Sequence, residues 1–198
     1  MVPREVRLVA LSQMAYVGGL AVCLAIRPGY LVSADEGGIS NFGVHAVTGV
    51  PFTCGFLGAA GLLVAAARAM APTGELERRM RAALLALAGI LVVVLATTYG
   101  YKSSAWLHDL HVDVAIAATF AEAGIAVWLV ARVRHGAAEV AALIALVAAL
   151  VLAGCSLAGV VHVLLATQLA GAVAFGVLLT RAADALASGT DRRAAPIT

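Results

Sequence analysis

The sequence has few charged residues, few aromatic residues and little cysteine. Charged residues make up 12% of its 198 residues and aromatic residues 6%, whereas 63% are apolar. Such a chain has too little polar surface for a soluble module, so a single membrane domain is expected. The three cysteines, Cys23, Cys54 and Cys155, lack any metal-binding spacing. A Cys23–Cys54 disulfide is one interpretation, and buried free thiols are the favoured one.

Lysine is almost absent: Lys102 is the single lysine among thirteen basic residues. The arginines do not form a basic stripe, so no nucleic-acid partner is expected. Eleven basic residues lie in alternate gaps between the apolar runs, and only Arg27 and Lys102 lie in the intervening gaps. Basic residues concentrate in cytoplasmic loops, so both termini are predicted to be cytoplasmic. The excess of arginine and alanine indicates a bacterial source, and hence the inner (plasma) membrane.

The apolar runs predict six membrane-spanning helices, since a helix needs about 20 residues to cross the hydrocarbon core. The stretch 140–180 carries no formal charge and is too long for one helix, so we interpret it as two antiparallel spans. The predicted fold class is all-α, a polytopic transmembrane helix bundle formed by one domain (1–184) and followed by a disordered cytoplasmic tail (185–198). A charged connector, 74–81, separates the second and third spans. The predicted spans are 6–26, 47–70, 82–99, 109–131, 140–157 and 161–180.

Four of the five histidines fall at the predicted outer ends of the spans. His108 and His111 are three residues apart and Asp109 and Asp113 four apart, so each pair shares a face of the fourth helix. Three imidazoles with a carboxylate would suit zinc or copper, and a histidine pair would suit haem. The alternative is a solvated rim at the level of the lipid headgroups, with the loop acids Asp35 and Glu36 beside it. The candidate metal ligands are His45, His108, His111 and His162.

Glu122 lies near the middle of the predicted fourth span, where an unpaired carboxylate costs several kcal/mol. Eleven residues, about three helical turns, separate it from His111, so the two side chains project from nearly the same face. Gln13 and Gln168 have comparable predicted depth and are its expected neutral partners. Glu122 is therefore either a proton-carrying or substrate-contacting group beneath the outer cluster, or a protonated link between helices.

Short motifs resemble those of a known family. The first outer loop reads GISNFG at residues 38–43, the second span contains Pro51, and His108 precedes a fourth span that contains Phe120. This order resembles the DRAM-like (damage-regulated autophagy modulator) superfamily and its bacterial relatives over about residues 5–180. The resemblance implies a six-helix membrane protein that acts through lipids or membrane partners, with Ser40, Asn41 and His108 as its outer polar positions. The acidic lead-in to the loop and the extra His45 depart from the family pattern.

These observations predict an integral membrane protein whose outward-facing pocket, lined by His and Asp, binds a lipid headgroup or small amphiphile or regulates a membrane partner. Membrane lipids are the expected partners, with a membrane protein or a second copy of the chain as further options. One alternative is a metal-dependent lipid hydrolase, or a single-haem or metal redox protein, that uses the outer histidines. Another is a proton-coupled carrier that uses Glu122, and whether the chain is an enzyme stays open. The candidate ligand-binding residues are Ser40, Asn41, His45, His108, Asp113 and Glu122.

Overall fold

The computed structural model describes residues 2–33, 38–133 and 136–194, and every regular element in these ranges is helical. Between the first two long helices lie the short helix α2 (Tyr30–Ser33) and the 3₁₀ helix η1 (Gly38–Phe42). The predicted all-α class with six spans is confirmed. The six long helices are α1 (Arg4–Ile26), α3 (Ala46–Ala69), α4 (Glu75–Thr98), α5 (Ala105–Arg132), α6 (Ala137–Leu157) and α7 (Leu164–Ala194).

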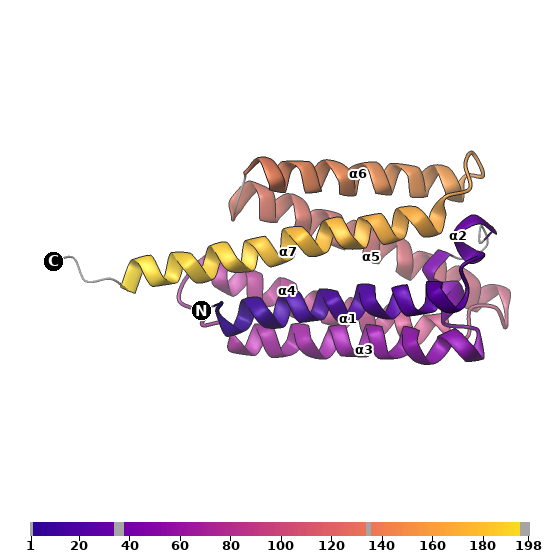
Figure 1. Cartoon of the computed structure of the whole chain (residues 1–198), viewed down its shortest axis with the longest axis horizontal. Helices are drawn as coiled ribbons and strands as arrows, with labels where there is room; N and C mark the ends of the chain where they lie inside the picture. Colours follow the sequence, from indigo (N-terminus) through magenta and orange to yellow (C-terminus); the bar gives the residue numbers. More distant parts are fainter. Residues whose placement is uncertain (1, 34–37, 134–135, 195–198) are drawn as a thin grey trace.

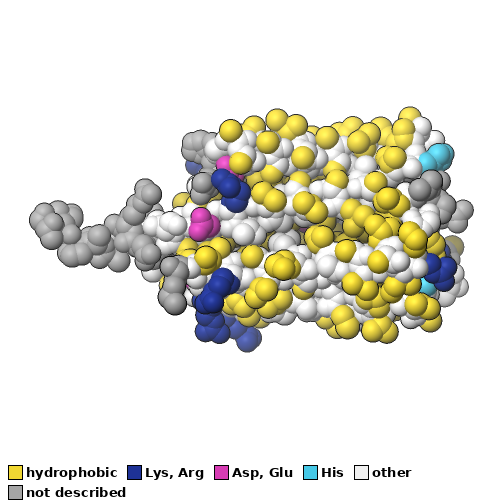
Figure 2. Space-filling view, in the orientation of Figure 1, with side chains coloured by type: hydrophobic (Ala, Val, Ile, Leu, Met, Phe, Trp, Pro, Cys, Tyr) yellow, Lys and Arg dark blue, Asp and Glu magenta, His cyan; other side chains and the backbone are white. Residues whose placement is uncertain are grey.

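Each of the six long helices has the length and apolar composition needed to cross a membrane. They lie side by side, and both chain ends are at the same end of the bundle (Figure 1). Apolar side chains are spread along the face shown in Figure 2, whereas most of the charged side chains visible there gather at the end that carries the termini. This end is named the arginine end, and the opposite one, which carries His45 and His111, the histidine end. The fold is that of a multi-pass membrane protein.

Two predicted boundaries are wrong. The charged connector 74–81 is helical from Glu75, since Gly74 is the N-cap of α4 and Arg79 pairs with Glu75 one turn away at 2.7 Å. The predicted disordered tail instead continues α7 from residue 185 to Ala194, because no proline interrupts this run and Leu186 is buried against the core. The remainder of that tail, 195–198, lies outside the described residues.

Helices α1 and α3 make the closest helix pair in the bundle. A Cβ atom placed on Gly19 would lie 2.8 Å from the Cα of Gly55, so the two backbones are in direct contact. Small residues permit such an approach between membrane helices, where hydrophobic burial alone does not drive association. Helix α6 packs mainly on α7, α4 lies between α3 and α5, and α7 contacts α1, which closes the bundle.

The buried side chains form two cores, one in each half of the bundle. The larger core fills the arginine half with aliphatic side chains such as Leu84, Leu129 and Leu179. The smaller core fills the histidine half and contains Phe42 and Phe52, both fully buried. Because Phe42 belongs to η1, this loop is part of the packed interior and positions its polar neighbours inside the end of the bundle.

Candidate functional site

The polar residues of η1 are held between α3 and α7 at the histidine end. All five residues of η1 (38–42) are buried. Gly38 has a φ of 51°, a backbone conformation that favours glycine. The next peptide N–H, that of Ile39, donates to Oε1 of Gln168 at 2.8 Å, and the Thr48 hydroxyl donates to the last carbonyl of η1 at 2.7 Å. These bonds fix the backbone on both sides of Ser40 and Asn41.

His111 is the single buried side chain in the half of α5 nearer the histidine end, with 5% of its surface exposed. Its Nε2 lies 2.8 Å from Oγ of Ser40, and its Nδ1 lies 3.0 Å from Oγ1 of Thr97. The ring also stacks on Tyr101, with ring centroids 4.8 Å apart. The structure therefore brings two residues predicted at the outer pocket, Ser40 and His111, into direct contact.

Asn41 connects η1 to the loop between α4 and α5. Its Oδ1 accepts hydrogen bonds from Nζ of Lys102 at 2.6 Å and from the Tyr101 hydroxyl at 3.3 Å. The ammonium group of Lys102 also lies 5.7 Å from the centre of the Tyr101 ring. One of the two basic residues predicted for the outer side thus stands directly beside the buried polar residues of η1.

His45 lies on another side of the histidine end, at the start of α3. Its Nε2 is 2.6 Å from the Tyr30 hydroxyl, and the Arg27 guanidinium lies 5.8 Å from the Tyr30 ring centre. Beside His45 the surface opens into a groove of about 480 Å³, bounded by the residues that follow η1, the first turns of α3 and the end of α4. Its walls mix apolar and polar side chains, among them Val44, His45, Val50, Thr53, Cys54 and Tyr99.

The other predicted site residues do not join these groups. His108 and Asp113 are exposed on α5, although the His108 ring lies 5.9 Å from that of Tyr101. His162 lies in the turn before α7, which begins at Leu164, three residues after the predicted start of the span at residue 161. The loop acids Asp35 and Glu36 lie outside the described residues.

The predicted metal site of the four outer histidines is not assembled. Across residues 2–33, 38–133 and 136–194, no three His, Cys, Asp or Glu side chains come together in positions that could hold a metal ion. The physical reason is that the ring nitrogens have other partners: His111 contacts two hydroxyl groups and His45 a third.

Glu122 is half-buried in the part of α5 nearer the arginine end, at a distance from η1. The prediction that Gln168 shares its depth is wrong, because α7 begins at Leu164 and Gln168 therefore lies in its first turns, bonded to η1. Glu122 is thus a separate polar position within the bundle and does not belong to the histidine cluster.

Three contributors at the histidine end were missed by the sequence analysis: Tyr30, Thr97 and Tyr101. Lys102 was predicted for the outer side, but not as a site residue. Thr97 carried a visible signal, because residues 82–96 contain no hydroxyl side chain and Thr97 ends that apolar run. Tyr30 and Tyr101 carried none, since their roles depend on which rings pack beside them.

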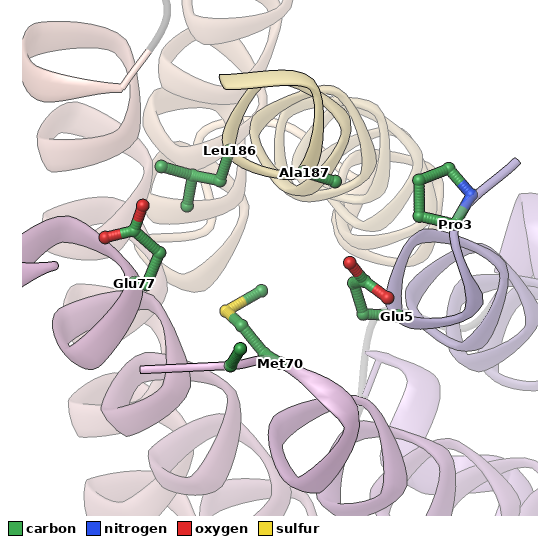
Figure 3. Close-up of a pocket in the computed structure, with 7 residues that line it drawn as sticks. Pro3, Glu5, Met70, Glu77, Leu186 and Ala187 are labelled. Atoms are coloured by element: carbon green, nitrogen blue, oxygen red, sulfur yellow. The ribbon is translucent and has the colours of Figure 1, made fainter. Parts of the chain in front are cut away.

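A second hollow, of about 140 Å³, lies at the arginine end between α1, α3, α4 and α7 (Figure 3). Glu5 and Glu77 line it, and Glu77 is 5% exposed. The Glu77 carboxylate lies against Gly74, where a Cβ atom would meet it. An acidic side chain in the first turn of a helix is favoured by the helix dipole, so its position at the start of α4 accounts for Glu77.

Comparison with protein-family models, curated proteins and solved structures finds no match to this chain. The fold and site define a multi-pass membrane protein with a buried chain of Ser, His and Thr hydrogen bonds at one end, next to an open groove of mixed polarity.

Proposed function

We propose that this protein binds a membrane amphiphile, through its headgroup and the adjoining part of its acyl chain, at the histidine end of the bundle. The observation that carries the proposal is the groove beside His45, which is open and has a volume of about 480 Å³. A pocket for a small ligand combines mostly apolar walls with a few polar groups that orient the ligand. The groove meets this description, and it lies at one end of helices that have membrane-spanning length.

The chemistry of the groove favours an amphiphile with an anionic headgroup. Val44 and Val50 supply apolar surface, whereas His45 and Tyr99 supply groups that form hydrogen bonds. The exposed cation of Arg27 stands beside Tyr30, the partner of His45. An anionic headgroup would meet this cation while its acyl chain continued along the apolar wall and the outside of the bundle.

We propose further that the bundle lies in a bacterial inner membrane, with the arginine end in the cytoplasm and the groove on the outer side. The concentration of arginine at one end of the spans supports this orientation. The resemblance to DRAM-like proteins, and a role in regulating a membrane partner, stay predictions that agree with an outer lipid site.

Native mass spectrometry of the detergent-purified protein tests the binding directly. We expect phosphatidylglycerol to bind more tightly than phosphatidylcholine, because only the former carries a net negative charge. Val50→Trp fills the groove and should lower the affinity for phosphatidylglycerol about tenfold, which corresponds to about 1.4 kcal/mol.

Val47→Trp is the matched control. Val47 lies on the same helix as Val50 and is similarly exposed, yet it does not line the groove. It should leave the affinity unchanged. Equal phosphatidylglycerol affinities in the wild type, Val50→Trp and Val47→Trp would refute the groove as the binding site.

A second candidate function, proton-coupled transport, draws support from Glu122, an ionisable residue that is half-buried within the apolar helix α5. Ionisable residues within membrane spans commonly mark ion or proton paths. In proteoliposomes with a pH-sensitive dye, Glu122→Gln would abolish proton movement if the carboxylate carries it, while the variant stays folded. Equal proton flux through both proteins would exclude this role.

A further inference from the structure

The contact between Ser40 and His111 has the direction that nucleophilic catalysis requires. Thr97 settles this direction, because its hydroxyl lies 3.0 Å from the carbonyl of Val94 and 3.2 Å from that of Val93. A hydroxyl has one proton, and here it is directed to these carbonyls, so Thr97 Oγ1 accepts from Nδ1 of His111. Both partners of the buried ring are neutral hydroxyls, which favours the neutral imidazole. Nε2 is then the acceptor, and Ser40 Oγ donates to it at 2.8 Å.

This arrangement matches the roles in a hydrolytic nucleophile–base pair. The base must be within hydrogen-bonding distance of the nucleophile, and a third group must hold the base in the correct tautomer. Ser40, His111 and Thr97 fill these three positions and come from η1, α5 and α4. The stacked ring of Tyr101 holds the imidazole plane in place.

The residue beside the nucleophile supplies a donor for the negative charge that develops on a carbonyl oxygen. The Lys102 ammonium can only donate, so the atom of Asn41 that it contacts is the amide oxygen. The Asn41 amide nitrogen is therefore turned away from Lys102, and none of the described residues accepts a hydrogen bond from it. A side-chain amide next to a nucleophile is one of the groups that stabilise an oxyanion.

We propose that Ser40 is a nucleophile that cleaves the acyl ester of an amphiphile bound at the histidine end, with His111 as the general base and Asn41 as the oxyanion donor. This proposal rests on the proposed function, which supplies the substrate. The groove begins at Gly43, the residue that directly follows η1, and Ser40 keeps 7% of its surface exposed. In a membrane lipid the ester bonds lie between headgroup and acyl chain, so a lipid bound in this groove of mixed polarity would bring an ester to the histidine end.

The reaction proceeds in two steps. Oγ of Ser40 attacks the ester carbonyl carbon while its proton passes to Nε2 of His111, and the oxygen that becomes negative is stabilised by the Asn41 amide. The bond to the alcohol oxygen then breaks, and the alcohol leaves with the proton from Nε2. Water next attacks the acyl-serine and gives a proton to His111, after which the carboxylic acid leaves and Ser40 regains its proton. The net reaction is ester plus water to acid plus alcohol. Throughout, the second ring proton of His111 stays on Nδ1 and is donated to the Thr97 hydroxyl.

A fluorophosphonate probe carrying a fluorophore tests this proposal on the full chain in detergent micelles. We expect covalent labelling of the wild type, mapped to Ser40 by peptide mass spectrometry. Ser40→Ala should remove the label, and His111→Gln should slow labelling by about 100-fold or more, as loss of a general base does. Ser103→Ala is the matched control, since Ser103 is an exposed serine at the same end whose hydroxyl donates to Gly100, and it should label like the wild type.

Thr97 is a positioning residue, and its variants separate orientation from folding. Thr97→Val keeps the shape but loses the acceptor for Nδ1, so labelling should slow, and Thr97→Ser should restore it. Release of fatty acid from phosphatidylglycerol in mixed micelles should follow the same order across the variants.

The outcomes distinguish this proposal from the one on which it rests. If folded wild-type protein binds phosphatidylglycerol but Ser40 takes no label, the hydrogen bonds only anchor η1 and the hydrolytic proposal is wrong. If phosphatidylglycerol binding is absent while Ser40 is labelled, the nucleophile is real and the lipid site is wrong. Labelling that persists unchanged in His111→Gln would also overturn the assigned base.

Discussion

The contact between α1 and α3 yields a sharp prediction, because two adjacent glycines of α1 have opposite surroundings. A Cβ atom added to Gly19 would lie 2.8 Å from Cα of Gly55 and 3.0 Å from the carbonyl oxygen of Pro51. A Cβ atom added to Gly18 would have no atom within 4 Å. The same substitution at the two positions therefore changes helix propensity equally and packing very differently.

The expected magnitudes follow from these distances. Gly18→Ala should stabilise the protein by up to about 1 kcal/mol, since alanine is the better helix former. At Gly19 the atoms in the way belong to backbone and cannot rotate aside, so the helices must separate until the contact reaches at least 3.4 Å. Overpacking of this kind costs about 1–3 kcal/mol, which leaves Gly19→Ala roughly 2 kcal/mol less stable than Gly18→Ala.

The assay is reversible unfolding of the detergent-purified proteins by added dodecyl sulfate, followed by helical circular dichroism. Gly19→Ala should unfold at a lower fraction of dodecyl sulfate than the wild type, and Gly18→Ala at an equal or higher one. The reasoning about close helix contact would be refuted if the two variants had the same midpoint.

Two further predictions concern the ion pair at the arginine end and the cysteines. Arg181→Ala should lower the free energy of unfolding by about 2 kcal/mol, because the guanidinium is 2.6 Å from the carboxylate of Glu139, which is 3% exposed. Arg79→Ala removes an exposed ion pair within α4 and should change the free energy of unfolding by less than about 1 kcal/mol. Equal effects of the two substitutions in the same unfolding assay would contradict the role assigned to burial. Maleimide should label Cys54 in the folded protein and Cys23 only after unfolding, since Cys54 is exposed and Cys23 is fully buried. Peptide mass spectrometry reads this difference, and early labelling of Cys23 would show that α1 and α3 separate in solution.

The sequence alone determined the helices and the two ends of the bundle. An apolar run of bilayer length must satisfy its backbone hydrogen bonds internally, so each such run forms a helix whatever its neighbours are. Once the six crossings are known, each polar residue outside the spans is assigned to one end or the other. For this reason Ser40, Asn41, His45 and His111 could be predicted at one end before any packing was known.

Helix ends were less predictable, because they depend on local caps and on burial beyond the apolar run. The low hydropathy of residues 75–81 predicted a connector between two helices, yet the ion pair of Glu75 and Arg79 stabilises the first turns of α4. Likewise the end of α7 continues past the apolar stretch, with Leu186 still packed against the core.

Which polar residues meet was decided only by the tertiary structure. Hydropathy and charge give the depth of a residue, but partners across a bundle depend on the order and rotation of the helices. That order buries η1 between α3 and α7, turns His111 toward Ser40 and Thr97, and leaves His45 with Tyr30. The same four histidines could have formed one metal site on a differently ordered bundle, whereas in this one His111 and His45 contact hydroxyl groups instead.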